Sequence, residues 1–316
     1  MLLVAGDLLV RGAAALAHKW GVPSLIVGLT IVAFGTSAPE LIVSVQAVLT
    51  GASELAIGNV IGSNIANILL VLGVPALIMA LPTNVAGVGR NAAVGLFATV
   101  LLIVLIFMPM GGPLVRWHGI ILFGGIVLYL IWMFALAKSG AKDPALIEMA
   151  DMTDMEGSPK SYSVMILFTL LGIFGLAFGG DMIVKNATVL ATGFGVSEAF
   201  IGLTIVAIGT SLPELATVLV ASYRGHNEVA IGNILGSNIF NILAVMGAAS
   251  IVGPAHIPSE LMVYDIWVML AATVALTIFV MRRAPIGRKS GIILLIAYIL
   301  YMAAVASRFV AASPSL

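Results

Sequence analysis

The chain has 316 residues, of which 61% are hydrophobic and only 9% are charged, and its formal net charge is zero. This composition lies far outside that of soluble proteins, and the balanced charge gives no indication of nucleic-acid binding. Because the chain contains no cysteine, it forms no disulfide and offers no thiolate to a metal. Apolar runs of about twenty residues, the length that crosses a bilayer, recur along the whole chain. The sequence therefore predicts an all-α polytopic membrane protein.

Ten apolar segments are predicted to span the membrane, and the second, third, seventh and eighth of them are long and interrupted by glycine. Met1–Val10 is apolar but has no basic region before it, so no cleavable signal peptide is predicted. The predicted spans are residues 1–17, 22–50, 54–81, 88–108, 115–137, 162–190, 196–222, 228–253, 262–281 and 288–309.

A hydrophilic segment at residues 138–161 divides these spans into two groups of five. Its charged residues are typical of a solvated linker. We therefore divide the chain into a first repeat at residues 1–137, a linker at 138–161 and a second repeat at 162–316. Since five is an odd number, the second repeat enters the membrane in the opposite orientation. The prediction is thus two inverted-topology repeats of five helices each.

Basic residues indicate the orientation, because cytoplasmic loops are enriched in Lys and Arg. If both termini lie outside and the linker lies inside, the external loops and tail hold only Arg116 and Arg308. The cytoplasmic side then holds Lys19, Arg90, Lys138, Lys142, Lys160, Arg224, Arg282, Arg283, Arg288 and Lys289. This distribution predicts a multi-pass protein of the plasma (inner) membrane with both termini outside and a cytoplasmic linker.

One stretch occurs twice, at a constant separation of 174 residues. The first copy reads G-L-T-I-V-A-F-G-T-S-A-P-E-L at Gly28–Leu41 and G-N-V-I-G-S-N-I-A-N at Gly58–Asn67. The second reads G-L-T-I-V-A-I-G-T-S-L-P-E-L at Gly202–Leu215 and G-N-I-L-G-S-N-I-F-N at Gly232–Asn241. Twelve of the fourteen residues in Gly28–Leu41 are identical in the second copy, so the two halves arose by duplication.

The first predicted span is short compared with its duplicate. The constant separation aligns Met1 with Gly175, so the apolar run Val164–Phe174 has no counterpart in the first half. Two explanations are open: a natural chain that begins upstream of Met1, or a first helix that spans the membrane only in part. The missing length favours an upstream start.

Glu40 and Glu214 lie inside apolar runs, where an unpaired carboxylate is costly and marks a functional site. Pro39 precedes Glu40 and is expected to break the helix, because proline lacks an N–H and clashes with the carbonyl four residues back. Broken helices in corresponding positions of two halves are typical of a transporter's binding site. The donors around each break are oxygens, which suit hard cations such as Ca2+ or Na+. Without a cation, two such carboxylates are expected to take up protons.

Structural interpretations of these residues are also open. Glu40 and Glu214 could cap half-helix N-termini, where a carboxylate is favoured, although duplication together with helix breakage argues for a functional role. The repeated serines could be small residues that let helices approach. The repeated asparagines of the G-N-x-x-G-S-N motif could cap broken helix ends.

Two further acidic residues are duplicated at the same separation, Asp7 and Asp181. Each has a basic residue four positions later, Arg11 and Lys185, and this spacing allows an intrahelical ion pair. We predict a structural or gating role for the two aspartates rather than ion ligation.

The motifs G-T-S-x-P-E and G-N-x-x-G-S-N-x-x-N, in two copies, resemble the α-repeats of the calcium/cation antiporter superfamily. The likeness is greatest to the prokaryotic sodium/calcium exchangers, and it covers essentially the whole chain. The resemblance implies a ten-helix fold whose core is formed by spans 2, 3, 7 and 8. It also implies cation sites clustered at the middle of the membrane, with spans 1 and 6 sliding to alternate access.

Carried over by residue, the resemblance implies that Glu40 and Glu214 bind Ca2+ together with backbone carbonyls near Thr36 and Thr210. Flanking Na+ sites would use hydroxyls, and two asparagines would complete the centre. These further residues are Ser37, Ser211, Ser63, Ser237, Asn67 and Asn241. Potassium-dependent exchangers and some prokaryotic members have Asp where this chain has Asn241, so K+ co-transport is not expected.

The predicted function is a secondary active antiporter that exchanges Ca2+ for Na+ by alternating access. The alternative is exchange of Ca2+, or another cation, for H+ on the same fold. Inverted repeats favour alternating access over a channel, and no histidine constellation or Ser–His pair in the apolar core indicates an enzyme. No cofactor is predicted beyond the transported ions Ca2+ and Na+. The expected partners are the lipid bilayer and small cations, with no nucleic acid and no obligatory protein partner.

Overall fold

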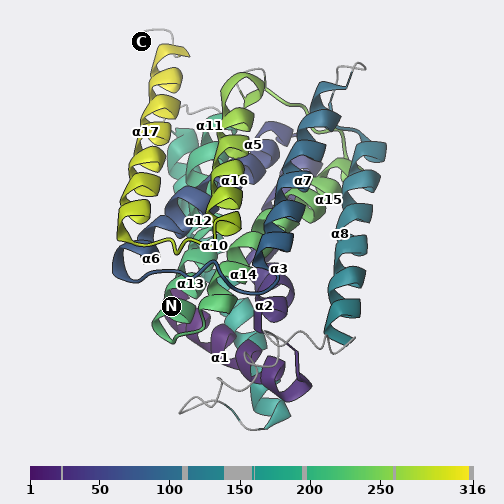
Figure 1. The fold of residues 1–316 in the computed structure, drawn as a ribbon. Helices are drawn as coiled ribbons and strands as arrows, with labels where there is room; N and C mark the ends of the chain where they lie inside the picture. Colours follow the sequence, from purple (N-terminus) through teal and green to yellow (C-terminus); the bar gives the residue numbers. More distant parts are fainter. Residues whose placement is uncertain are drawn as a thin grey trace.

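The computed structural model describes residues 1–22, 24–108, 113–138, 159, 161–193, 198–258 and 261–312. Nearly all of the linker predicted at residues 138–161 lies outside these ranges. The described residues form a bundle of helices (Figure 1). The predicted spans coincide with its helices to within a few residues, because long apolar runs were the signal that defined them.

In the first half, α1 (Leu2–Trp20) precedes two segmented spans and two continuous helices. The second predicted span consists of α2 (Ser24–Val27), η1 (Gly28–Val32), α3 (Ala33–Thr36) and α4 (Ala38–Leu49). The third consists of α5 (Ser53–Ala66), η2 (Asn67–Val71) and α6 (Gly73–Ile78). The continuous helices are α7 (Val88–Phe107) and α8 (Arg116–Lys138).

The second half repeats this order. It begins with α10 (Tyr162–Gly193), followed by α11 (Glu198–Ile201), η3 (Gly202–Val206), α12 (Ala207–Thr210) and α13 (Leu212–Tyr223). The next span consists of α14 (Asn227–Phe240), η4 (Asn241–Val245) and α15 (Met246–Val252). The last elements are η5 (Leu261–Asp265), α16 (Ile266–Met281) and α17 (Arg288–Ala312).

Eight helices within the described ranges are long and apolar enough to cross a membrane. A bent pair, Gly28–Thr36 and Ala38–Leu49, would be a ninth span if its two parts are counted together. The helix α1 is not among them, and it carries the charges of Asp7, Arg11 and Lys19. The fold is therefore an all-α, multi-pass membrane fold.

The helix breaks lie where the prolines predict them. In the first copy the chain bends by 49° at Ser37, whose backbone has φ −85° and ψ 5°. Ser211 has almost the same backbone angles, φ −82° and ψ −1°, in the second copy, although Gly202–Tyr223 there counts as one span without a bend above 40°. In both copies proline stands at the start of the next helix, where its missing N–H leaves no helical hydrogen bond unmade. Each break thus directs a new helix N-terminus into the protein.

Two π-helical segments occur at equivalent positions in each repeat, which the sequence pattern did not predict. They are η1 and η2 in the first half and η3 and η4 in the second, and η5 is a further π-helical segment in the second half. The hydroxyls of Thr30 and Thr204 donate to the carbonyls of Ile26 and Phe200, both at 2.6 Å. Because π-helical turns occur often at functional sites, their duplication marks these four spans as different from the continuous helices.

Three of the segmented spans, the third, seventh and eighth, are the most buried of the candidate membrane spans in the described ranges. In the third and eighth spans, 78% and 83% of the residues of the apolar window are buried, compared with 22% for α8. Glycines allow the two halves to interlock there: a Cβ on Gly62 would lie 2.6 Å from the carbonyl oxygen of Leu203. In the mirrored contact, a Cβ on Gly236 would lie 2.7 Å from that of Leu29. The core is therefore built by both halves together.

This contact leads to a prediction about Gly62. We expect Gly62→Ala to destabilise the protein by about 1–3 kcal/mol, because backbone atoms must move to make room for the new methyl group. Gly124 in α8 is the matched control, since a Cβ there meets nothing within 4 Å. Thermal unfolding of the purified protein in detergent tests this. Equal midpoints for Gly62→Ala and Gly124→Ala would contradict the interlocked core.

The helix α1 lies antiparallel to α10. A Cβ on Gly12 would meet the backbone of Thr169, and a Cβ on Gly172 would meet that of Leu9. Leu2 lies against Gly179, about midway along α10. Met1 therefore does not reach the end of the bundle at which the C-terminus lies (Figure 1).

The structure tests one of the two predicted intrahelical ion pairs. In α1, Arg11 lies 3.6 Å from Asp7, so this pair is present. Asp7 is also paired with Arg224, which follows the last residue of α13, and this contact between helices was not predicted. The equivalent of Arg224 in the first repeat is Thr50, so no basic side chain stands there. In the pair Asp181–Lys185, the side chain of Lys185 lies outside the described residues.

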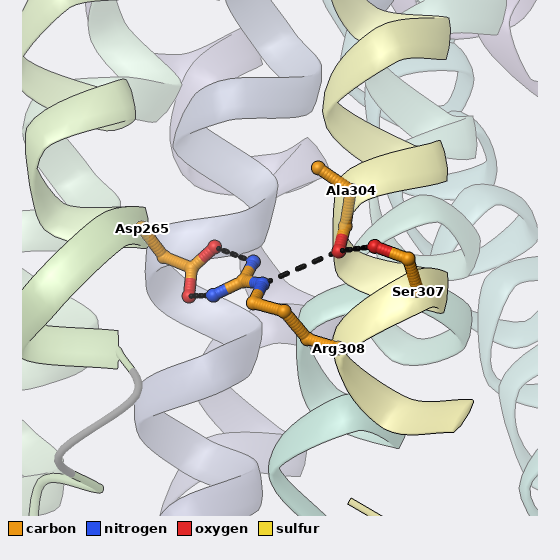
Figure 2. A network of polar contacts seen from close by, with 4 residues as sticks. All are labelled: Asp265, Ala304, Ser307 and Arg308. Atoms are coloured by element: carbon orange, nitrogen blue, oxygen red, sulfur yellow. Dashed lines mark hydrogen bonds and ion pairs between the residues drawn. The ribbon is translucent and has the colours of Figure 1, made fainter. Parts of the chain in front are cut away.

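A second ion pair, missed by the sequence analysis, joins η5 to α17 (Figure 2). The Arg308 guanidinium donates to both carboxylate oxygens of Asp265, at 2.8 and 3.0 Å. In the first half Asn91 stands at the position of Asp265 and accepts a hydrogen bond from the Tyr129 hydroxyl at 3.1 Å. The equivalent positions of the two repeats therefore carry a neutral contact in the first and a charged one in the second.

Candidate cation site

Glu40 and Glu214 are both fully buried, each in the first turn of the helix that follows the break. A helix N-terminus carries partial positive charge and unpaired N–H groups, so a carboxylate is favoured there. The two N-termini meet, because the Ser37 hydroxyl, three residues before Glu40, contacts the Glu214 carboxylate. Both the capping interpretation and the cation-binding interpretation place the two carboxylates at helix N-termini. The side chains around the glutamates must therefore distinguish between the two interpretations.

Glu214 is held by a serine from each half. Its Oε1 accepts hydrogen bonds from the Ser37 hydroxyl at 3.2 Å and from the Ser237 hydroxyl at 3.1 Å. The duplicated positions do not repeat this contact: neither carboxylate oxygen of Glu40 has a hydrogen-bond partner within the described ranges, and the Ser211 hydroxyl has none either. The two glutamates of the motif are therefore inequivalent in this conformation.

The threonines lie in a pseudo-symmetric network with residues of the other half. The Thr36 hydroxyl donates to Asn233 Oδ1 at 3.0 Å and lies 3.3 Å from the Ser237 hydroxyl. Both contacts recur at the duplicated positions: Thr210 donates to Asn59 Oδ1 at 3.1 Å and lies 3.3 Å from the Ser63 hydroxyl. The serines and threonines predicted for the site are thus brought together across the interface between the halves.

The two predicted asparagines are also fully buried. Asn67 donates through Nδ2 to Asn238 Oδ1 at 3.1 Å, which leaves its own Oδ1 without a partner. Neither polar side-chain atom of Asn241 has a partner among the described residues. Because buried polar atoms in folded proteins are nearly always paired, such atoms need an explanation in terms of a ligand, a water or a change of conformation.

All ten predicted site residues are therefore buried. Four of them, Glu214, Ser37, Ser237 and Thr36, share one hydrogen-bond network, and Thr210 and Ser63 belong to a second network with Asn59. Sequence reasoning did not include Asn59 and Asn233 among the site residues, although both belong to the duplicated G-N motif. That repetition was the signal that could have identified them.

Six buried oxygens without a partner among the described residues belong to the predicted site residues. They comprise carboxylate, amide and hydroxyl oxygens, which are the ligands preferred by Ca2+ and Na+. Two ionised carboxylates match the charge of one Ca2+. In the part of the chain that the structure describes, no group of three or more His, Cys, Asp or Glu residues could hold a metal. These oxygens are Glu40 Oε1 and Oε2, Glu214 Oε2, Asn67 Oδ1, Asn241 Oδ1 and Ser211 Oγ.

A helical membrane protein whose duplicated, broken helices bring two carboxylates together is a transporter by class, because such helices build the binding sites of secondary transporters. The family is shown by comparison. Residues 1–135 and 164–306 match the model of the sodium/calcium exchanger protein family, and the chain belongs to that family. The predicted superfamily is thereby confirmed, and the family is one of transporters rather than enzymes.

Individual relatives extend over the same length. The chain is 40% identical over 304 residues to the putative antiporter CaxA of Alkalimonas amylolytica, covering 95% of this chain and 94% of that protein. It is 30% identical over 330 residues to the sodium/calcium exchanger MaX1 of Methanosarcina acetivorans, covering 95% and 94%. A solved structure of the sodium-calcium exchanger NCX_Mj, soaked with Na+ and Sr2+, superimposes with a TM-score of 0.78 at 30% identity, covering 96% and 94%.

Proposed function

We propose that this chain is a secondary active antiporter that exchanges Ca2+ for Na+ across the plasma membrane by alternating access. The observation that carries the proposal is the pair of buried glutamates, one from each repeat, surrounded by hydroxyl and amide oxygens of both repeats. Ca2+ and Na+ would share these ligands, so that binding of one excludes the other. Mutually exclusive binding is the minimum requirement for exchange.

The proposal includes the architecture that such a mechanism needs. The chain would comprise ten spans in two inverted repeats, residues 1–137 and 162–316, joined by a cytoplasmic linker at 138–161, with both termini outside. Inverted repeats supply two related conformations that open to opposite sides. In this scheme α1 and α10 slide against the core, and Asp7 and Asp181 have structural or gating roles. The lipid bilayer and the transported cations are the only partners required.

Exchange of Ca2+ for H+ is the second candidate. It is supported by the Glu40 carboxylate, whose oxygens have no hydrogen-bond donor among the described residues, so that a proton would be a natural occupant in the absence of a cation. Ca2+ uptake into proteoliposomes under separate Na+ and H+ gradients tests both candidates. Uptake driven by the Na+ gradient alone supports Na+ exchange, and uptake driven by the pH gradient alone supports H+ exchange. Uptake that needs neither gradient would contradict an antiporter.

Asn241 leads to a prediction about potassium. An uncharged amide at this position lacks the third carboxylate that would balance a further monovalent cation, so we expect exchange to proceed without K+. We also expect Asn241→Asp to change the ion dependence of transport more than it changes stability. Ca2+ uptake is measured with K+ replaced by choline, in wild type and variant. Loss of wild-type uptake in choline would contradict the prediction.

A further inference from the structure

Asn59 and Asn233 lie behind the two threonines that end the helical segments before the breaks. Each asparagine is fully buried, and each accepts the hydroxyl proton of a threonine from the other repeat, at 3.1 Å for Asn59 and 3.0 Å for Asn233. Thr36 and Thr210 are four residues before Glu40 and Glu214. The asparagines therefore fix the turn from which each glutamate helix begins.

The two asparagines differ in how they are held themselves. Asn59 has a partner at both ends of its amide group, because its Nδ2 donates to the Ser44 hydroxyl on α4 at 3.0 Å while its Oδ1 accepts from Thr210. In the second repeat Val218 stands at the position of Ser44. Asn233 Nδ2 consequently has no partner within the described ranges. One asparagine is thus fixed at both ends of its amide group and the other at one end.

This difference coincides with the difference between the glutamates. Glu214 follows the threonine that Asn59 holds, and it accepts two serine hydroxyls. Glu40 follows the threonine that Asn233 holds, and its oxygens have no partner within hydrogen-bond distance among the described residues. The Glu214 side of the site is therefore preorganised, whereas the Glu40 side is left to be ordered when a cation binds. Preorganisation raises affinity because less freedom is lost on binding.

We propose that Asn59 and Asn233 are positioning residues of the cation site. Ser44 accepts a hydrogen bond from Asn59, whereas Val218 at the equivalent position offers none to Asn233, and this difference makes the Glu214 side of the site more rigid than the Glu40 side. This inference rests on the proposed function, because it assumes that the site binds the transported Ca2+. It assigns no ion contact to either asparagine: both act through the threonines.

Two single substitutions are designed to reverse the difference between the Glu40 side and the Glu214 side of the site. Ser44→Val removes the partner of Asn59, and Val218→Ser gives Asn233 the partner that it lacks. We expect Ser44→Val to raise the half-saturating Ca2+ concentration of uptake by about two- to tenfold, the range for loss of one hydrogen bond, with the maximal rate nearly unchanged. Val218→Ser is expected to lower the half-saturating concentration, and the double variant to lie between the two.

Ser250→Val is the matched control, because Ser250 is also a fully buried serine, with no hydrogen-bond partner among the described residues. A merely structural effect would lower the maximal rate of Ser44→Val and Ser250→Val alike, at unchanged half-saturation. That result, or a Val218→Ser variant identical to wild type, would overturn the proposal.

A second readout separates this inference from the proposed function. The Ca2+ dependence of the unfolding temperature in detergent reports binding without transport. If the wild type binds Ca2+ but does not exchange it, the proposed function fails and the positioning role is tested by binding alone. In that assay a shifted Ca2+ dependence in Ser44→Val and Val218→Ser supports the role, and identical curves overturn it. No response to Ca2+ in the wild type would overturn both.

Discussion

Glu40→Gln and Glu214→Gln are each expected to abolish Ca2+ exchange while leaving the protein folded. Removing one carboxylate leaves a single negative charge for a divalent cation in a low-dielectric interior, where the loss is not compensated by solvent. Glutamine keeps a side-chain oxygen, so at position 214 the serines retain an acceptor. The measurement is gradient-driven uptake of radioactive Ca2+ into proteoliposomes, together with size-exclusion profiles to confirm folding.

Glu54→Gln is the matched control for these variants. Glu54 is also duplicated, at Glu228, and it also lies in the first turn of a helix, but it is exposed. We expect Glu54→Gln to exchange Ca2+ at nearly the wild-type rate. Uptake at the wild-type rate in either Glu40→Gln or Glu214→Gln would exclude that glutamate from the site.

The ion pair in Figure 2 leads to the largest expected effect on stability. Arg308→Leu leaves the Asp265 carboxylate buried without its partner, and removing one member of a buried pair costs up to about 3–5 kcal/mol. We therefore expect a clearly lower unfolding temperature in detergent. Arg116→Leu is the control, since Arg116, the first residue of α8, makes an exposed contact with the carbonyl of Ile251 on α15.

The first half indicates how the loss can be reversed. Asn91 stands at the position of Asp265 and accepts a hydrogen bond from the uncharged Tyr129 hydroxyl. Tyr301 on α17 matches Tyr129 when the G-I-I-L sequences at 119–122 and 291–294 are aligned, at a separation of 172 residues. We expect the double variant Asp265→Asn/Arg308→Leu to recover most of the stability lost in Arg308→Leu. Equal unfolding temperatures for Arg308→Leu and the double variant would show that the unpaired charge of Asp265 does not cause the loss of stability.

The spans and the helix breaks were predictable because their causes are local. Apolar runs define the helices, and Pro39 and Pro213 disrupt the turn before them whatever surrounds it. The location of the glutamates followed from the same local rule. The prediction that these residues gather in the protein interior depended on the duplication, since equivalent breaks in two halves point to one site.

Pairing between distant helices was not predictable in this way. Asp265 and Arg308 are 43 residues apart on different elements, and no periodicity connects them. The inequality of Glu40 and Glu214 was also hidden, because the motif around both is the same. In our proposal it is reinforced by Ser44 and Val218, which lie four residues after each glutamate and look like ordinary helix positions until the contact between Asn59 and Ser44 is known.

The interlocked core has a consequence for synthesis. Thr36 and Asn233 are 197 residues apart, and Ser37 and Glu214 are 177 apart. At roughly 5–20 residues per second, the ribosome needs on the order of ten to forty seconds to make the partners of a turn that is already in place. During this interval the first repeat is held in the bilayer by its apolar spans alone. Glu40 and the glycine surface of α5 have not yet made their contacts with the second repeat. The site is therefore completed late, when both repeats are inserted and can close on each other.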